Sequence, residues 1–173
     1  MGKLVPYDNE VHRAQFLELN VEYLTWFVEC MRDIHGIDMA STAEGTVQDY
    51  VEMVLDSYTS AKPPDGIIYV LEIDGKSEGM GALRRVRGEI GEIKRMYIRP
   101  RHRGKGLGRS MFRTLIERAK EYGYSTLRLE TGDFMKAAQS IYRSEGFEET
   151  DMHPETEVPE PYHPHMVFME KEL

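Results

Sequence analysis

The residues best suited to chemistry lie in one short segment, residues 101–108, where glycines alternate with other side chains, several of them basic. Glycines at positions 104, 106 and 108 allow the backbone to curl tightly and to point successive N–H groups at one anion. A helix is expected to begin within this segment, and its N-terminus adds partial positive charge. Arg103, Lys105 and Arg109 raise the positive potential further. This segment therefore predicts a binding site for a diphosphate.

Two common phosphate-binding motifs do not describe this segment. A P-loop requires G-x-x-x-x-G-K-[ST], which is absent from the chain. The dinucleotide fingerprint G-x-G-x-x-G fails because Arg109 stands where the third glycine should follow Gly104 and Gly106. The glycines alone also fit a tight strand-to-helix turn that carries basic surface side chains, so both interpretations stand at this point.

Hydrophobic periodicity predicts the elements that position this segment. Apolar residues at helical spacing indicate helices at residues 10–31, 47–58, 107–122 and 136–145. Runs of β-forming residues indicate strands at residues 67–73, 80–86, 90–98, 125–130 and 167–171. Asp74-Gly75 favours a hairpin between the first two strands, and Gly123 favours the end of the third helix. This order is typical of a mixed α/β or α+β domain around one sheet.

Composition limits the class of protein. A length of 173 residues favours one domain over residues 1–173. The formal net charge of −8 disfavours nucleic acid as a partner, although Lys and Arg concentrate between residues 84 and 109. That cluster fits either a local anion site or a solvated charged face. No apolar run reaches the ~18–20 residues of a membrane span, no secretory signal is visible, and a single cysteine excludes an internal disulfide. We therefore expect a cytoplasmic protein with no membrane partner.

Two segments resemble the motifs of the GCN5-related N-acetyltransferase (GNAT) family. The central family motif, R/Q-x-x-G-x-G/A, is matched by Arg101, Gly104 and Gly106. Further along the chain, residues 138–147 resemble the second motif, A-x-x-x-Y-x-x-x-G-F, with Tyr142 as its tyrosine. The resemblance is strong between these two motifs, and the N-terminal part of the chain fits the family only as helices.

The resemblance implies a GNAT-type single domain with a central, mostly antiparallel mixed sheet, a splayed strand pair and flanking helices. It implies an N-acetyltransferase that moves the acetyl group of acetyl-CoA to a primary amine of a small molecule or protein. The transfer is expected to occur by direct attack in a ternary complex, without a metal. A non-catalytic acyl-CoA-binding module is the alternative. Dimers are common in the family, so a homodimer is one possible assembly, and the acceptor amine is not identified.

By position, the resemblance also assigns the contacts to acetyl-CoA. The backbone of Met96, Tyr97 and Ile98 is expected to bind the pantetheine arm in the gap between the splayed strands. The backbone N–H groups of the next segment are expected to hold the pyrophosphate: Arg103, Gly104, Lys105, Gly106, Leu107, Gly108 and Arg109. Many relatives carry an asparagine seven residues before the motif tyrosine that contacts the arm of CoA, whereas this chain has Met135 there. Either the preceding Thr131-Gly132-Asp133 segment supplies polar contacts instead, or that contact is missing.

Two residues are assigned to catalysis by the resemblance. Tyr142 matches the tyrosine that protonates the leaving thiolate, and a packed core aromatic is its alternative interpretation. Glu92 matches a glutamate that acts as general base in some relatives, and a surface carboxylate at a strand end is its alternative. A base is needed because an alkyl amine with a pKa of ~10.4 is almost fully protonated at neutral pH. Glu130, in the next strand, is a competing base.

The segment 152–164 is expected to form a loop beside the acceptor site. It carries three acids that we expect to attract a cationic amine: Glu155, Glu157 and Glu160. Three histidines lie in or next to it: His153, His163 and His165. No cysteine or helical histidine pair accompanies them, so no metal site is predicted.

Overall fold

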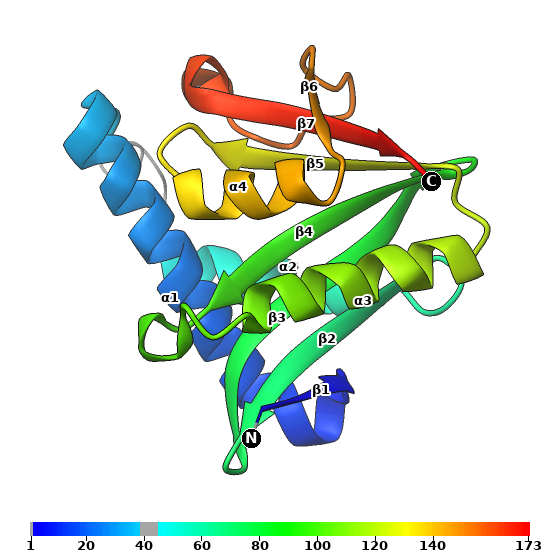
Figure 1. Cartoon of the computed structure of the whole chain (residues 1–173). Helices are drawn as coiled ribbons and strands as arrows, with labels where there is room; N and C mark the ends of the chain where they lie inside the picture. The colour runs from blue at the N-terminus through cyan, green and yellow to red at the C-terminus, as the bar shows by residue number, and fades with distance from the viewer. Residues whose placement is uncertain (1, 39–44) are drawn as a thin grey trace.

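The computed structural model describes residues 2–38 and 45–173 of the chain (Figure 1). Within these residues the strands form one seven-stranded sheet in the order β1-β2-β3-β4-β5-β7-β6. The strands are β1 (Lys3–Pro6), β2 (Gly66–Ile73), β3 (Lys76–Arg87), β4 (Ile90–Ile98), β5 (Thr126–Gly132), β6 (Glu148–Thr150) and β7 (Met166–Glu172). The helices are α1 (Asn9–His35), α2 (Val47–Thr59), α3 (Leu107–Glu121) and α4 (Lys136–Ser144), with 3-10 turns η1 (Pro100–His102) and η2 (Glu160–His165). Neighbouring strands are antiparallel except β4 and β5, which confirms the mostly antiparallel mixed sheet.

Helices cover both faces of the sheet. On one face, Phe16 and Leu19 of α1 pack with Leu55 of α2. On the other face, α3 and α4 share a second apolar cluster that includes Phe112 and Tyr142. Strand β2 supplies both clusters by the alternation of side chains along a strand: Ile68 and Val70 on one side, Tyr69 and Leu71 on the other. This two-sided burial explains why residues 67–71 form an uninterrupted apolar run.

Helix α1 extends beyond the predicted residues 10–31 at both ends. At its N-terminus the Asp8 carboxylate accepts hydrogen bonds from the N–H groups of Glu10 (2.8 Å) and Val11 (3.3 Å). Such a cap stabilises a helix by about 1 kcal/mol. At its C-terminus Gly36 adopts a left-handed conformation with φ 71°. The added turns carry His35 towards the end of β5, where it meets Asp133.

Strands β4 and β5 run in parallel but separate after a short contact. Their pairing joins residues 90–92 of β4 to residues 126–128 of β5 and goes no further. A bulge bends β4 beyond this point, because Met80 and Ala82 of β3 oppose Tyr97 and Lys94, and Arg95 has a φ of 57°. The predicted splayed pair is therefore confirmed, and one edge of each strand faces a gap (Figure 1).

Two glycines of β3 lie beside the bulge. A Cβ on Gly79 would lie 2.9 Å from the Tyr97 carbonyl oxygen of β4, so the two backbones approach too closely for a side chain. A Cβ on Gly81 would lie 2.7 Å from the sulfur atoms of Met96 and Met111, and these flexible side chains would have to shift. The predicted end of the third helix is also confirmed, since Gly123 directly follows α3 and its cap residue with a φ of 76°.

Three strand segments were not predicted from the sequence patterns. Strand β1 is four residues long and ends in proline, and β6 is a three-residue, fully exposed Glu-Glu-Thr segment. Strand β3 begins at Lys76, before the predicted residue 80, and buries the polar Glu78, whose carboxylate pairs with Arg101 and His102. Short or polar strands of this kind carry too few alternating apolar residues to be recognised. Across the described part of the chain, none of the helices has both the length and the apolar character of a membrane crossing.

Candidate active site

The glycine-rich loop forms an open N-terminus for α3. Gly104 and Gly106 have φ values of 75° and 76°, and a Cβ on either would meet no atom within 4 Å. Gly106 is the N-cap residue, and the first backbone bond of the helix runs from the N–H of Ser110 to its carbonyl oxygen. The N–H groups just before Ser110 have no carbonyl partner within the helix, as at any helix start. The loop can therefore receive an anion through its backbone.

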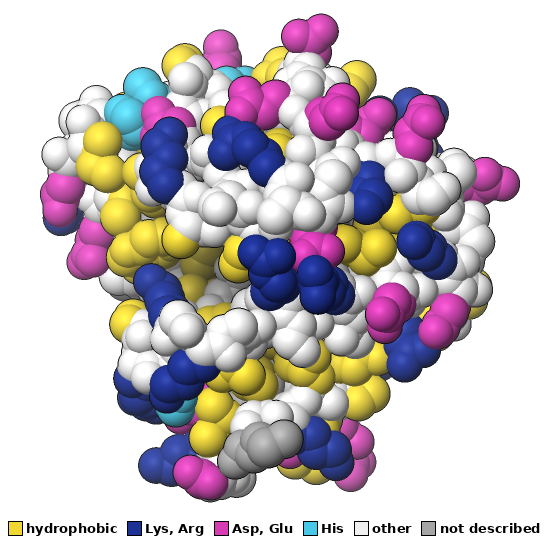
Figure 2. Space-filling view, viewed as in Figure 1, with side chains coloured by type: hydrophobic (Ala, Val, Ile, Leu, Met, Phe, Trp, Pro, Cys, Tyr) yellow, Lys and Arg dark blue, Asp and Glu magenta, His cyan; other side chains and the backbone are white. Residues whose placement is uncertain are grey.

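The basic side chains of the loop are arranged less uniformly than their sequence suggests. Arg103 turns back, so that its Nε donates to the carbonyl oxygen of Ile98 at 2.8 Å. The Lys105 ammonium lies 3.4 Å from the Arg101 carbonyl oxygen, and Arg109 pairs with Glu145 at 3.2 Å. The backbone rather than these side chains thus provides the directed donors of the loop. Figure 2 shows Lys and Arg side chains around a hollow with hydrophobic walls, above the parting of β4 and β5.

Met96, Tyr97 and Ile98 form the end of β4 that borders the gap. Tyr97 and Ile98 pair with β3 on one side only, opposite Met80 and Gly79. Their other side is turned towards the separated β5. The structure therefore places these three residues beside the gap, as the sequence predicted for a bound arm.

Tyr142 lies in the core between α4 and α3. Its ring packs against Phe112 with centroids 4.7 Å apart, and only 6% of the residue is exposed. Burial, with a smaller contribution from the nearby Tyr23, raises the pKa of the Tyr142 phenol above its ordinary value. The phenol is therefore protonated at neutral pH, although the raised pKa also makes it a weaker acid. Tyr142 also packs in the core, as the alternative interpretation predicted. A position in the core and a role as proton donor do not exclude each other.

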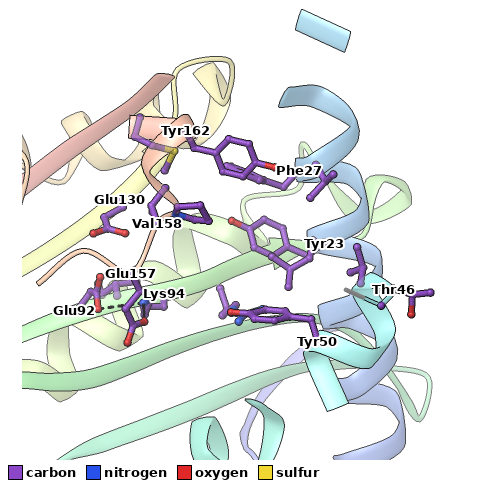
Figure 3. Close-up of a pocket in the computed structure, with 18 residues that line it drawn as sticks. Tyr23, Phe27, Thr46, Tyr50, Glu92, Lys94, Glu130, Glu157, Val158 and Tyr162 are labelled. Carbon is purple, nitrogen blue, oxygen red and sulfur yellow. Dashed lines mark hydrogen bonds and ion pairs between the residues drawn. The ribbon is translucent and has the colours of Figure 1, made fainter. Parts of the chain in front are cut away.

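A cavity of about 400 Å³ lies on the α1 side of the gap (Figure 3). Aromatic rings of Tyr23, Phe27, Tyr50 and Tyr162 form much of one end. The opposite end carries three carboxylates, from Glu92, Glu130 and Glu157. The cavity is thus built by α1, the start of α2, β4, β5 and the segment before η2, which are far apart in sequence.

The two predicted bases differ in their partners. Glu92 is 6% exposed and its carboxylate pairs with Arg84 at 3.0 Å and with Lys94 at 3.5 Å. Glu130 Oε1 is buried and has no hydrogen-bond partner among the described residues. Burial raises the pKa of the Glu130 carboxyl above its ordinary value, and a hydrogen bond from Thr156 opposes this rise only in part. Glu130 is therefore the carboxylate with capacity to accept a proton.

A second, much smaller cavity adjoins both glutamates. It measures about 10 Å³ and is also lined by His153, whose Nε2 is buried without a partner among the described residues. Burial, assisted by Arg128, lowers the pKa of His153, so its imidazole is neutral. Such a space holds roughly one water molecule. The Glu130 side chain therefore contacts a polar interior as well as the larger cavity.

Two of the three acidic residues that were predicted to attract a cationic amine form ion pairs with arginine and lysine side chains instead. Glu155 pairs with Arg87 at 2.6 Å and Arg128 at 3.1 Å, and Glu157 pairs with Arg84 and Lys94. Although burial acts in the opposite direction, hydrogen bonds from Arg84 and Lys94 lower the pKa of Glu157 to about 2. Both carboxylates therefore already have cationic partners. Their ion pairs connect the segment to β3, β4 and β5, and they are less able to attract an amine than unpaired carboxylates would be. Glu160 does not line the cavity.

One set of possible metal ligands was missed by the sequence patterns. His35 Nε2 lies 2.8 Å from Asp133, and the rings of His35 and His165 stack at 3.7 Å. The potential ligand atoms of these three residues lie within 4.8 Å of one another. His163 is elsewhere, with its Nε2 2.7 Å from the Val158 carbonyl oxygen. The trio joins α1 to the ends of β5 and η2, and its hydrogen bond is sufficient to explain its arrangement.

Comparison with known proteins identifies related chains. Residues 22–147 match the model of the Acetyltransferase (GNAT) family. The chain is 34% identical over 97 residues to the uncharacterized N-acetyltransferase YjgM of Escherichia coli, covering 54% of this chain and 58% of that protein. It is 37% identical over 95 residues to IAA acetyltransferase of Azospirillum brasilense, covering 54% of this chain and 61% of that protein. The matches therefore span less than two thirds of these relatives.

A solved structure shares the fold over the whole chain. The PaiA N-acetyltransferase of Thermoplasma acidophilum, solved in complex with coenzyme A, superposes with a TM-score of 0.68 at 15% identity. The superposition covers 100% of this chain and 99% of that one. At this identity the agreement concerns the fold, and it includes the end-to-end order of helices and strands described above.

Proposed function

Because the chain belongs to the Acetyltransferase (GNAT) family, we propose that it transfers the acetyl group of acetyl-CoA to a primary amine of a small molecule or protein. One observation supports the proposal: a glycine-rich loop at the start of α3 and the cavity that contains Glu130 both border the gap between β4 and β5, and Glu130 Oε1 is buried without a hydrogen-bond partner among the described residues. The coenzyme A complex of the Thermoplasma relative supports the choice of ligand.

The residues of the loop and of β4 suit acetyl-CoA, which supplies an activated thioester. The backbone N–H groups from Arg103 to Arg109 hold the pyrophosphate, in the open space in front of Gly104 and Gly106. The free side of Met96, Tyr97 and Ile98 holds the pantetheine arm, because its backbone groups face the gap rather than another strand.

Proton transfers assign the remaining roles in a ternary complex. Glu130 accepts a proton from the acceptor ammonium, directly or through a water, which frees the nitrogen lone pair. The nitrogen then bonds to the acetyl carbon, the carbon–sulfur bond breaks, and the Tyr142 hydroxyl donates its proton to the departing sulfur. The second proton of the nitrogen passes through water to the Tyr142 phenolate, which leaves a neutral amide and restores the phenol. Glu92, the other candidate base, holds Arg84 and Lys94 in place, since its own carboxylate is engaged by both.

Calorimetric titration with acetyl-CoA, followed by thiol release with a panel of primary amines, tests this proposal. We expect saturable binding and amine-dependent thiol release. Binding without release for every amine would favour the non-catalytic acyl-CoA-binding module. No binding of acetyl-CoA would contradict the proposal as a whole.

A further inference from the structure

We propose that the acceptor is a single amine carried on an aromatic or similarly apolar body, rather than a polyamine or the lysine of a polar peptide. This inference rests on the proposed function and concerns the 400 Å³ cavity. It follows from the walls of the cavity, from its charge balance and from the position of its unpaired carboxylate.

The walls suit a flat apolar group. Tyr23 and Phe27 are side chains of α1 that line the cavity (Figure 3). The ring of Tyr162 packs against that of Phe27, with ring centroids 5.8 Å apart. Tyr23 is itself held by Tyr97 of β4, with centroids 5.6 Å apart. These mutual contacts fix the rings before any ligand arrives, which lowers the entropic cost of binding. A cavity of roughly 150 Å³ accommodates one benzene ring, so this one has room for a ring and an alkylamine chain.

The charges of the cavity leave room for one ammonium. Glu157 and Glu92 are paired with Lys94, at 2.7 Å and 3.5 Å, and both also pair with Arg84. Arg95 donates to the Asn20 side chain at 3.0 Å and lies 5.1 Å from the centre of the Tyr58 ring. Glu130 forms no ion pair among the described residues. Among the described residues that line the cavity, a second ammonium on the ligand would therefore find no carboxylate without a cationic partner, and its desolvation would oppose binding. Arg95 also lines the cavity, and its positive charge would repel a second ammonium.

Geometry orients the ligand. Glu130 and the aromatic rings lie at opposite ends of the cavity (Figure 3). Glu130 belongs to β5, whose separated edge borders the gap that is to hold the thioester. An amine directed at Glu130 would therefore leave its body among Tyr23, Phe27 and Tyr50.

The first test compares kcat/KM for 2-phenylethylamine, putrescine and a short lysine-containing peptide with saturating acetyl-CoA. We expect 2-phenylethylamine to be favoured by about 30-fold or more, the effect of burying a phenyl group. A preference for putrescine or the peptide, or no turnover of 2-phenylethylamine, would overturn the inference. Turnover of the other amines would leave the proposed function standing, so the two failures are distinguishable.

A pair of variants on α2 isolates the aromatic wall. Tyr50 lines the cavity and is 50% exposed, so Tyr50→Ala should fold normally. It should raise the KM for 2-phenylethylamine about 10-fold and leave acetyl-CoA affinity unchanged. Met53→Ala is the matched control, because Met53 is on the same helix, is 73% exposed and does not line the cavity. Equal KM values in the two variants would contradict the inference.

Changing the charge balance gives an independent readout. Lys94→Met removes one of the two cations shared by Glu92 and Glu157, which adds negative charge beside the ligand. We expect the kcat/KM ratio of putrescine to 2-phenylethylamine to rise about 10-fold, one strong charge interaction. An unchanged ratio would show that the paired carboxylates do not determine the number of ammonium groups accepted.

Discussion

The glycine-rich loop and the 400 Å³ cavity border the same gap, and we propose that they recognise ligands by different means. The loop is a continuous stretch of backbone, and its donors are N–H groups that any residue but proline carries. The cavity is assembled from side chains of α1, α2, β4, β5 and the segment before η2. Its charged groups are mostly neutralised by one another.

This difference predicts how each region responds to substitution. A backbone site depends on the path of the chain, so side-chain changes disturb it only where they fill its space. A side-chain site can be altered residue by residue while the fold persists. Substitutions in the two regions should therefore affect different kinetic parameters, and the following experiments are ordered from the largest expected effect to the smallest.

Filling the loop should have the largest effect. Gly106→Glu places a carboxylate where the pyrophosphate is proposed to lie, and we expect acetyl-CoA affinity to fall by ~10³-fold or more, as measured by calorimetry. Gly75→Glu is a matched control, because Gly75 has a φ of 75° and equally open surroundings in a hairpin turn. A similar loss in both variants would attribute the effect to strain rather than to the loop.

Removing the proposed base should affect turnover but not acetyl-CoA binding. We expect Glu130→Gln to lower kcat/KM for the amine by ~10²–10³-fold. Because burial raises the pKa of Glu130, the wild-type rate should fall as the pH drops through a value above the ordinary glutamate range, and the variant should lack that limb.

Two glutamine variants control this experiment. Glu148→Gln lies in the exposed strand β6 and should be kinetically silent. Glu92→Gln leaves Glu130 in place and should slow turnover less than Glu130→Gln. If Glu92→Gln instead removes the acidic limb, the roles of the two carboxylates are reversed.

Removing the proposed acid should have a smaller effect. Tyr142→Phe keeps the ring that packs on Phe112, so the fold and acetyl-CoA affinity should be preserved. We expect kcat to fall by roughly 10²-fold, measured by thiol release. An unchanged kcat would leave Tyr142 with the core-packing role alone.

The smallest expected effect is on stability, and its sign opposes that on activity. Because the folded-state pKa of Glu130 is raised, its ionisation destabilises the fold above the unfolded pKa, and the cost disappears at lower pH. Glu130→Gln should therefore unfold later than wild type in urea at pH 8, by up to about 1 kcal/mol, and equally at pH 4. Earlier unfolding of the variant at pH 8 would show that the carboxylate is satisfied in solution.

How far the sequence predicted these regions follows from how each is built. The glycine-rich loop and the segment around Tyr142 are each contiguous, so their motifs could be read locally and resemble those of the GNAT family. That resemblance implied the splayed strand pair, which the structure confirms, whereas the roles of the loop and Tyr142 stay predictions. The partners of the cavity are distant: Arg84 and Glu157 are 73 positions apart, and His35 and Asp133 are 98 apart. The sequence therefore offered Glu155 and Glu157 as bare charges, because it cannot show that arginines of β3 and β5 approach them. The same limit explains why the sequence favoured Glu92 as the base, with Glu130 as a competitor: it could not show that Arg84 and Lys94 pair with Glu92.

Where β4 and β5 separate, each has an edge inside the sheet that does not pair with the other strand. These inner edges are additional to the outer edges at β1 and β6. The outer strands β1 and β6 are only four and three residues long, which limits the pairing of the sheet with another chain. The inner edges are longer, but the slot between them closes where residues 90–92 pair with residues 126–128. At its closed end the slot is one strand spacing wide, ~4.8 Å, so no further strand can be inserted there. The unpaired backbone groups beside that end are therefore open to a thin ligand but are a poor template for pairing with another chain.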